Sequence, residues 1–366
     1  RPRRDPFGDG FPLPSCRIHL DGLNPMAFRP HPDASPSARL CRRGRHWVRQ
    51  VSPLVLLSAL VGCSEAVPEP EVESPRRALG NITTTENLES CRGSRCFLFE
   101  VESPELREAA TGEIVVSDPA GASRGTVVSF SGGAGTGLRG GPDIEAWIEA
   151  GFRVARVQWD ANWWAGSSPS EGFAALACRP ATVTDWVAEH LVDDGQPLCV
   201  EGGSGGAGQV AYGLTHYGLE DVVSLAVPWT GFWMGRIDLG CLDADRLNAD
   251  LHYDERARRA IDYTYGFGPD EDGPCLRRDE AFRSAFAEAS TAVDADLYHP
   301  DTMVWHILAG ADAVGALGHG LSYYDAMLRA GSPLVRADVI QGAPHGLDEE
   351  GRARVRDVIL RECVAR

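Results

Sequence analysis

The sequence predicts an α/β fold in which a mostly parallel sheet is covered by helices on both faces. From about Cys96 to the C-terminus, short apolar segments alternate with longer segments of helical periodicity, which is typical of strand–helix–strand units. Several of the short segments are apolar throughout, as expected of strands that are buried on both faces. A hydrophobic content of 43% is sufficient for such a core.

The predicted strands and helices begin with an antiparallel pair. Residues 97–102 alternate in polarity and residues 113–116 are β-branched, and both patterns favour strands. An apolar run bounded by glycines, 126–130, fits a fully buried strand. A helix is predicted over 142–150, because Pro142 occupies a suitable first-turn position.

The middle of the chain continues the alternation. A strand is predicted over 153–159 and a mostly helical segment over 174–193. The short apolar strand 198–201 leads into a run of glycines, and a helix over 209–217 and a strand over 221–227 follow.

The interval from about 228 to 300 breaks this rhythm, because it contains helical and turn-rich sequence but no strong buried strand. We expect it to be a helical cap inserted after the strand that ends near residue 227. Two more strands, 302–308 and 335–340, complete the sheet. The final helix, 348–363, has apolar residues at helical spacing.

The first 62 residues differ in charge from the rest of the chain. They contain 10 Arg and 4 Asp, whereas the whole chain has a net charge of −17. A basic segment, 42–49, precedes an uncharged and mostly apolar run, 51–61, which is too short for a membrane span of ~20 residues. This layout predicts a leader and secretory signal peptide over 1–62. The acidic remainder would repel phosphate backbones, which excludes nucleic acid as a partner.

The apolar run ends in Leu60-Val61-Gly62-Cys63, which resembles the lipobox of bacterial lipoproteins. By that resemblance Cys63 would be lipidated and become the first mature residue. Export would then leave the protein in the bacterial periplasm or cell envelope, held to the membrane by its lipid anchor only. The alternative is an ordinary signal peptide in which Cys63 is incidental. Residues 63–90 are rich in Pro and Glu and predict a tether, which leaves 91–366 as the folded domain.

The cysteines after Cys63 agree with export. Cys91 and Cys96 flank a short loop and are expected to form a disulfide, and Cys241 and Cys275 are the second candidate pair. No Cys-x-x-Cys pair occurs, so the pattern does not predict a zinc ribbon. The odd number of cysteines in this region leaves at least one free thiol.

The segment Gly202-Gly203-Ser204-Gly205-Gly206 matches the Gly-x-Ser-x-Gly nucleophile elbow. The elbow needs small neighbours, because its serine occupies a strained turn between a strand and a helix. A flexible glycine loop is the alternative. The apolar strand before the segment and the helix after it favour the elbow, with Ser204 as nucleophile.

A second glycine-rich segment, Ser131-Gly132-Gly133-Ala134-Gly135, directly follows the strand 126–130. It resembles the His-Gly-Gly-Pro-Gly type of oxyanion loop. Charge that develops on a substrate oxygen needs two fixed N–H donors. We expect one from Gly205 and the other from Gly133, or less favourably from Ala134. A phosphate-binding loop is the competing interpretation, but the Gly-Lys-Ser/Thr ending of such loops is absent.

The remaining catalytic groups are predicted from chain order, which runs from the serine to an acid and then to a histidine. Asp312 follows the strand 302–308 and His345 follows the strand 335–340, so both are expected at the same edge of the sheet as Ser204. His319 is the rival base, but it precedes the last strand. We therefore predict that His345 is the base and that Asp312 orients it.

Together these motifs resemble the α/β-hydrolase superfamily of serine hydrolases, of the esterase and lipase type, from about residue 97 to the C-terminus. The glycine loop and the elbow also have a weak local similarity to prolyl aminopeptidases. The resemblance implies an α/β-hydrolase fold and an acyl-enzyme mechanism that needs neither a metal nor an organic cofactor.

Two aromatic clusters follow strands at the edge of the sheet where ligands bind in such folds. They are candidates for the substrate pocket, and packing of the cap against the core is the alternative interpretation. The two clusters comprise Trp159, Trp163 and Trp164, and Trp229, Phe232 and Trp233.

The sequence therefore predicts an exported serine hydrolase that cleaves a carboxylic ester, either small or polymeric, through an acyl-enzyme on Ser204. An aminopeptidase or an acyltransferase could use the same triad. A protein of a different class, a non-catalytic binding protein with this fold, is the second alternative.

Overall fold

A computed structural model of the protein describes residues 76–87, 91–231, 234–243 and 249–364. The strands within these residues form one mixed sheet. The predicted leader, the lipobox and most of the predicted tether lie outside these residues. The described residues belong to one compact unit. None of their helices is both long enough and apolar enough to cross a membrane.

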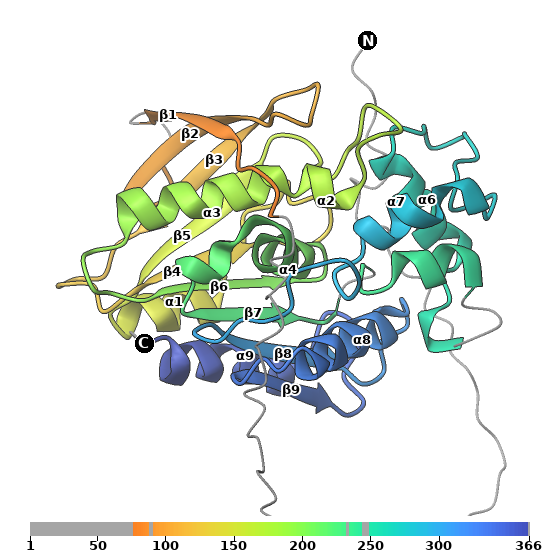
Figure 1. The fold of residues 1–366 in the computed structure, drawn as a ribbon. Coiled ribbons are helices and arrows are strands. Elements are labelled where there is room, and N and C mark those ends of the chain that lie inside the picture. The colour runs from red at the N-terminus through yellow and green to blue at the C-terminus, as the bar shows by residue number, and fades with distance from the viewer. Residues whose placement is uncertain (1–75, 88–90, 232–233, 244–248, 365–366) are drawn as a thin grey trace, which may run out of the picture. The chain divides into compact units, whose positions relative to one another are not determined.

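Three antiparallel strands open the sheet (Figure 1). They are β1 (Asn81–Glu86), β2 (Arg95–Glu102) and β3 (Ala110–Ser117), and β3 pairs with β5 (Arg153–Trp159). The predicted antiparallel pair corresponds to β2 and β3 and is confirmed. Strand β1 was not predicted, because its sequence NITTTE is polar and it forms the exposed edge of the sheet. It lies within the segment 63–90 that was expected to be a tether, so that expectation was wrong for residues 81–86, which pair with β2.

The rest of the sheet is parallel, in the spatial order β5-β4-β6-β7-β8-β9. Strands β4 and β6 are buried along their whole length, which explains why their sequences are mostly apolar and do not alternate; the buried Ser129 and Glu201 are polar exceptions. The bounds of the remaining parallel strands are β4 (Thr126–Phe130), β6 (Leu198–Gly203), β7 (Leu225–Trp229), β8 (Met303–Ala309) and β9 (Val335–Ile340).

Helices cover both faces of this sheet, as predicted (Figure 1). On one face, α1 (Pro142–Glu149) and α9 (Glu349–Glu362) bury Trp147 and Val358 in a common core with the sheet. The other face is covered by α3, α4 and α8, which contribute to the larger core. The bounds of the helices on this second face are α2 (Phe173–Leu176), α3 (Cys178–Leu191), α4 (Gly205–Tyr217) and α8 (Ala316–Arg329).

Two predicted boundaries were wrong by four residues. The helix expected from residue 209 already begins at Gly205, directly after Ser204. The strand expected from residue 221 begins only at Leu225, because Gly218 adopts a left-handed conformation and Leu219–Asp221 form a short 3-10 turn, η1. The acidic side chains of that turn bind Arg76, with N–O distances of 2.5 Å to Glu220 and 2.6 Å to Asp221.

The described residues between β7 and β8, the interval predicted as a cap, contain helices and turns but no strand. The two α-helices are α6 (Glu255–Thr264) and α7 (Arg283–Glu288). The side chain of Asp254 caps α6 by accepting a hydrogen bond from the amide of Ala257 at 2.7 Å. The short turns are η2 (Leu239–Asp243), η3 (Ala249–Leu251) and η4 (Glu280–Phe282).

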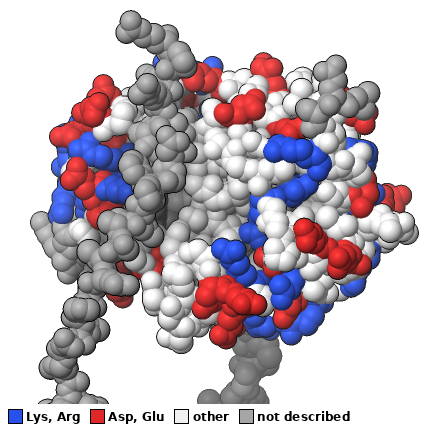
Figure 2. All heavy atoms as spheres, turned by 180° about the vertical axis from the view of Figure 1, so that it is seen from behind, with Lys and Arg blue, Asp and Glu red and all other residues white. Residues whose placement is uncertain are grey.

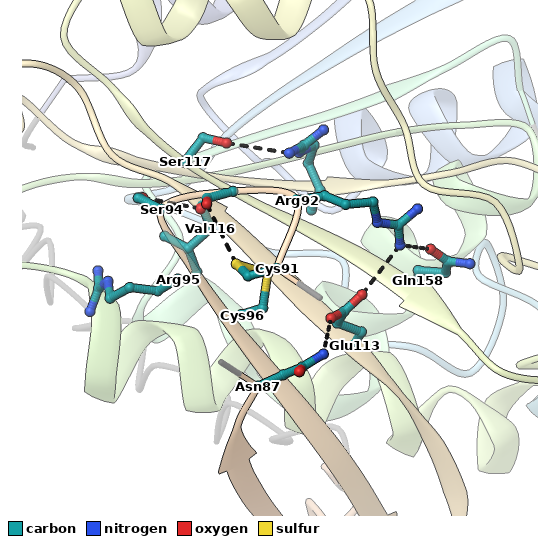
Figure 3. The surroundings of a disulfide bond; sticks show 12 residues. Asn87, Cys91, Arg92, Ser94, Arg95, Cys96, Glu113, Val116, Ser117 and Gln158 are labelled. Carbon is teal, nitrogen blue, oxygen red and sulfur yellow. Dashed lines mark hydrogen bonds and ion pairs between the residues drawn. A yellow bond between two sulfur atoms is a disulfide. The ribbon is translucent and has the colours of Figure 1, made fainter. Parts of the chain in front are cut away.

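Three disulfides connect these elements. Cys91 pairs with Cys96 and Cys241 pairs with Cys275, as the sequence suggested. Figure 3 shows the first pair beside Arg92, which points toward Glu113 of β3 and Gln158 of β5. The third disulfide, Cys199–Cys363, joins β6 to the end of α9 across 164 residues and was not predicted. Cys178 is the free cysteine of the described chain, and it is buried.

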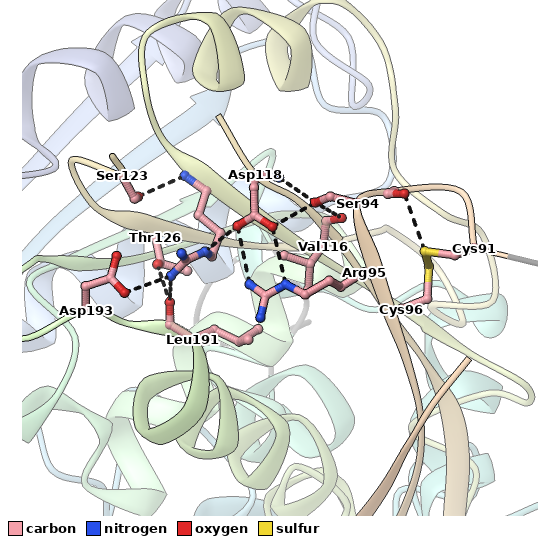
Figure 4. A network of polar contacts seen from close by, with 12 residues as sticks. Cys91, Ser94, Arg95, Cys96, Val116, Asp118, Ser123, Thr126, Leu191 and Asp193 are labelled. Atoms are coloured by element: carbon pink, nitrogen blue, oxygen red, sulfur yellow. Dashed lines mark hydrogen bonds and ion pairs between the residues drawn. A yellow bond between two sulfur atoms is a disulfide. The ribbon is translucent and has the colours of Figure 1, made fainter. Parts of the chain in front are cut away.

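A charged network fastens the antiparallel strands to the parallel ones (Figure 4). Asp118, just after β3, accepts hydrogen bonds from Ser94 at 2.8 Å, from Arg95 at 3.3 Å and from Arg153 at 2.6 Å. Burial raises the pKa of Asp118, but these hydrogen bonds outweigh burial and hold the pKa below its ordinary value of 3.8.

On the face of the molecule that Figure 2 shows, acidic and basic side chains lie beside one another.

Candidate active site

Ser204 occupies the sharp turn between β6 and α4. Its backbone has φ 53° and ψ −115°, a conformation that L-residues rarely adopt and that concentrates at functional sites. The flanking glycines are required by close packing: a Cβ atom on Gly202 would lie 2.5 Å from the backbone of Gly206, and one on Gly206 would lie 2.7 Å from the Phe130 carbonyl oxygen. The turn thus lies directly against the end of β4.

The structure brings Ser204, His345 and Asp312 together. His345 Nε2 lies 2.8 Å from Ser204 Oγ, and His345 Nδ1 lies 2.8 Å from Asp312 Oδ2. Asp312 follows β8 and His345 follows β9, so the ends of three parallel strands supply the three groups. The Asp312 side chain is fully buried, whereas 27% of the His345 side chain is exposed.

The hydrogen bonds define the roles of the two imidazole nitrogens. An ionised Asp312 accepts the Nδ1–H of His345, which leaves Nε2 unprotonated and facing the hydroxyl of Ser204. The second oxygen of Asp312 accepts the amide of Val314 at 2.9 Å and is thereby fixed in place. This arrangement can remove a proton from Ser204 and hold it on the ring.

His319, the rival base, lies elsewhere. It stacks on Tyr253 with ring centroids 4.6 Å apart, accepts the amide of Arg236 at Nδ1 and donates from Nε2 to the carbonyl of Leu251. Burial lowers its pKa to about 4. His319 therefore holds α8 to neighbouring segments as a neutral ring.

The predicted oxyanion residues lie beside the nucleophile. Gly205, Gly133 and Ala134 line the same pocket as Ser204. A Cβ atom on Gly205 would lie 2.2 Å from the Gly133 oxygen and 2.8 Å from its nitrogen, so the two backbones are in contact. The indole of Trp164 donates to the Gly133 oxygen at 3.2 Å and fixes that peptide. The amide of Gly205 is at the first position of α4, where helix amides have no acceptor within the helix.

A pocket beside Ser204, which we call the aromatic pocket, has a volume of about 120 Å³. Trp163 and Trp164, both predicted, lie in its wall, and Phe173, Met234, Arg256 and Ala260 complete the side-chain lining. The other predicted aromatic residues do not all lie here. Trp159 is in the core, where it donates to Gln209 at 2.9 Å, and Phe232 and Trp233 lie outside the described residues.

A second pocket, which we call the Arg139 pocket, has a volume of about 310 Å³ and also contacts Ser204 and His345. Trp229 and Arg139 line it. Arg139 lies 3.0 Å from the buried Glu201 and 3.6 Å from Asp143, with its guanidinium 4.8 Å from the centre of the Trp229 ring.

Glu201 is completely buried, three residues before Ser204. It accepts hydrogen bonds from Ser129 and, at 2.8 Å, from the indole of Trp229. Burial raises its pKa, while Arg139 opposes that effect. The Glu201–Arg139 pair was not predicted, because a charged residue inside a short apolar strand gives no indication of its partner.

Comparisons with known proteins detect only structural likeness. No protein-family model matches the sequence, and no curated protein matches it. A puromycin hydrolase superposes with a TM-score of 0.50 at 18% identity, over 78% of this chain and 39% of that one. Acylaminoacyl peptidase from Pyrococcus horikoshii gives 0.47 at 12% identity, over 76% and 42%. Acetyl xylan esterase from Paenibacillus sp. R4 gives 0.47 at 13% identity, over 77% and 89%.

The likeness to puromycin hydrolase, together with the strand order, identifies the architecture. The chain has the α/β-hydrolase fold. The chain spans about four tenths of the length of the acylaminoacyl peptidase and of the puromycin hydrolase. Within the α/β-hydrolase fold, Ser204, Asp312 and His345 have the expected chain order and the expected places at the ends of strands.

Proposed function

We propose that the protein is an exported serine hydrolase that cleaves carboxylic esters through an acyl-enzyme on Ser204. The observation that supports this most strongly is the continuous chain of hydrogen bonds from Ser204 through His345 to the buried Asp312. The strained backbone of Ser204 adds to it, because such strain persists where the surrounding structure enforces it.

In the proposed first step, His345 Nε2 takes the proton from Ser204 Oγ while Oγ bonds to the ester carbonyl carbon. The carbonyl oxygen becomes an oxyanion, which the amides of Gly205 and Gly133 stabilise. Asp312 stabilises the imidazolium formed at the same time. Collapse of the intermediate breaks the bond to the alcohol oxygen, and that oxygen receives the proton from His345.

The second step returns the enzyme to its starting state. Water replaces the alcohol, His345 Nε2 accepts one of its protons, and the oxygen attacks the acyl carbon. The bond to Ser204 Oγ then breaks, Oγ regains its proton from His345, and the carboxylic acid leaves. One proton of the water passes through His345 to Ser204 Oγ, and the other leaves on the carboxylic acid.

The charge of the aromatic pocket favours an ester hydrolase over an aminopeptidase. An aminopeptidase must bind the ammonium group of its substrate, for which a carboxylate is the usual partner. The described lining of this pocket contains no carboxylate and contains the cationic Arg256. The three disulfides support export, because disulfides persist in oxidising compartments.

The test is covalent labelling with a fluorophosphonate probe. Wild type should be labelled, Ser204→Ala should not, and the exposed Ser170→Ala should be labelled like wild type. Absence of labelling in folded wild type would contradict the proposal and favour a non-catalytic binding protein. Faster turnover of aminoacyl-nitroanilides than of p-nitrophenyl esters would instead indicate an aminopeptidase, and acyl transfer to an added alcohol in preference to water would indicate an acyltransferase.

Lipid anchoring at Cys63 remains part of the proposal. Cys63→Ala should move the protein from the membrane fraction to the soluble fraction. Unchanged partitioning would contradict the anchor without affecting the proposed chemistry.

A further inference from the structure

Arg256 is the one permanently charged side chain among the described residues that line the aromatic pocket. It is the second residue of α6, and Ala260, one helical turn later, lines the same pocket. Residues four apart lie on one face of a helix. This face of α6 therefore borders the space that opens onto Ser204.

Arg256 is an exposed residue, and no hydrogen bond or ion pair joins its guanidinium to any residue that the structure describes. The other two arginines of α6 differ. Arg258 is buried and donates to the carbonyls of Tyr253 and Cys241. Arg259 pairs with Glu255 at 2.9 Å and lies 3.6 Å from Asp272.

Acidic residues of the same interval already have partners. Asp238 pairs with Arg236 at 2.8 Å, and Asp243 pairs with Arg283 at 2.7 Å. Asp254 caps α6 through the amide of Ala257. These groups therefore do not neutralise Arg256.

Arg139, the cation of the Arg139 pocket, already has acidic partners within the protein. Arg139 faces both Glu201 and Asp143, so its charge is compensated within the protein. A substrate anion would have to compete with two carboxylates there. Arg256 offers its hydrogen-bond donors without such competition.

We infer that the aromatic pocket accepts acyl groups with an apolar chain that ends in a carboxylate, and that Arg256 binds this carboxylate. Hemi-esters of dicarboxylic acids are the corresponding substrates. Guanidinium matches carboxylate in geometry and charge, while Trp163, Trp164 and Phe173 supply buried apolar walls for the chain. The Arg139 pocket, which also contacts Ser204 and His345, is left for the alcohol. The inference rests on the proposed function and names its substrate class.

The test compares two p-nitrophenyl esters that differ in one terminal group, the hemi-ester of adipic acid and the matching ester of adipic acid monoamide. Wild type should prefer the carboxylate by about fivefold to tenfold in kcat/KM, the effect of one partly exposed ion pair. Arg256→Gln should abolish the preference and Arg256→Glu should reverse it. Arg259→Gln, on the same helix but outside the pocket lining, should keep it.

An undiminished preference in Arg256→Gln, or no preference in wild type, would overturn the inference while leaving the proposed ester hydrolysis intact. If wild type cleaved neither ester, the proposed function would fail. A measurement of ligand binding would then test, without catalysis, whether Arg256 binds a carboxylate.

The binding experiment uses Ser204→Ala, with the tryptophan fluorescence of Trp163 and Trp164 as the signal. Adipic acid monoamide should bind about fivefold more tightly than the neutral diamide. Adding Arg256→Gln should make the two affinities equal. Equal affinities in Ser204→Ala itself would overturn the inference whether or not the protein is an enzyme.

Discussion

Asp312 fixes the orientation of His345, because its carboxylate accepts a hydrogen bond from Nδ1 of that ring at 2.8 Å. Its role followed from its position after a strand and before His345, without any knowledge of its neighbours. The structure adds that the carboxylate is fully buried and bonded to the amide of Val314. By contrast, the Glu201–Arg139 pair could not be predicted, since its partners meet only through the packing of β6 against the loop after β4.

Replacing Asp312 by Asn should lower kcat by about 10⁴-fold, because an amide can no longer hold His345 in the tautomer that accepts the Ser204 proton. Steady-state kinetics on a p-nitrophenyl ester would measure the effect, with circular dichroism to show that the fold is intact. Asp193→Asn, a change at an exposed carboxylate, is the control. A loss of less than tenfold in folded Asp312→Asn would contradict the assigned role.

At the scale of elements, apolar and β-branched runs located strands whether or not the strand is fully buried. The fully buried strand β4, the largely buried β5 and the edge strand β9 were all predicted with their observed bounds. The edge strand β1 and the start of β7 were not, since β1 is polar and the 3-10 turn after Gly218 delays the start of β7.

The Asp118 network makes the junction between β2, β3 and β5 sensitive to acid. Because the pKa of Asp118 is lower in the folded protein than its ordinary 3.8, the carboxylate stabilises the fold above that pH, and this stabilisation is lost as the pH falls through the lower, folded value.

Asp118→Asn should therefore be less stable than wild type at pH 7 by about 1 kcal/mol. The difference should shrink from about pH 4 downward. Urea unfolding at a series of pH values would measure it. A difference that stays constant down to about pH 2 would show that the ion pairs do not cause it.

For the whole molecule, the Cys199–Cys363 disulfide is the connection that sequence reasoning missed. Its two cysteines are 164 residues apart in the sequence. They meet because α9 packs on the same face of the sheet as the side chain of Cys199. The pairing of Cys91 with Cys96 needed only a short loop, which is why it was visible in the sequence.

Removing both sulfurs in Cys199→Ala/Cys363→Ala should lower the free energy of unfolding by roughly 5 kcal/mol, because the disulfide closes a long loop. The loop closed by Cys91 and Cys96 spans five residues, so Cys91→Ala/Cys96→Ala should cost roughly 2 kcal/mol. Denaturant unfolding of the two variants would compare them. Equal losses would argue against loop closure as the source of the stabilisation.

The covalent intermediate on Ser204 is the central claim, and intact-protein mass spectrometry after rapid mixing with a p-nitrophenyl ester tests it most directly. The account predicts a mass increase of one acyl group, mapped by peptide analysis to Ser204 and absent from Ser204→Ala. Acylation at another residue, or a Ser204→Ala variant that turns over the ester as fast as wild type, would contradict it.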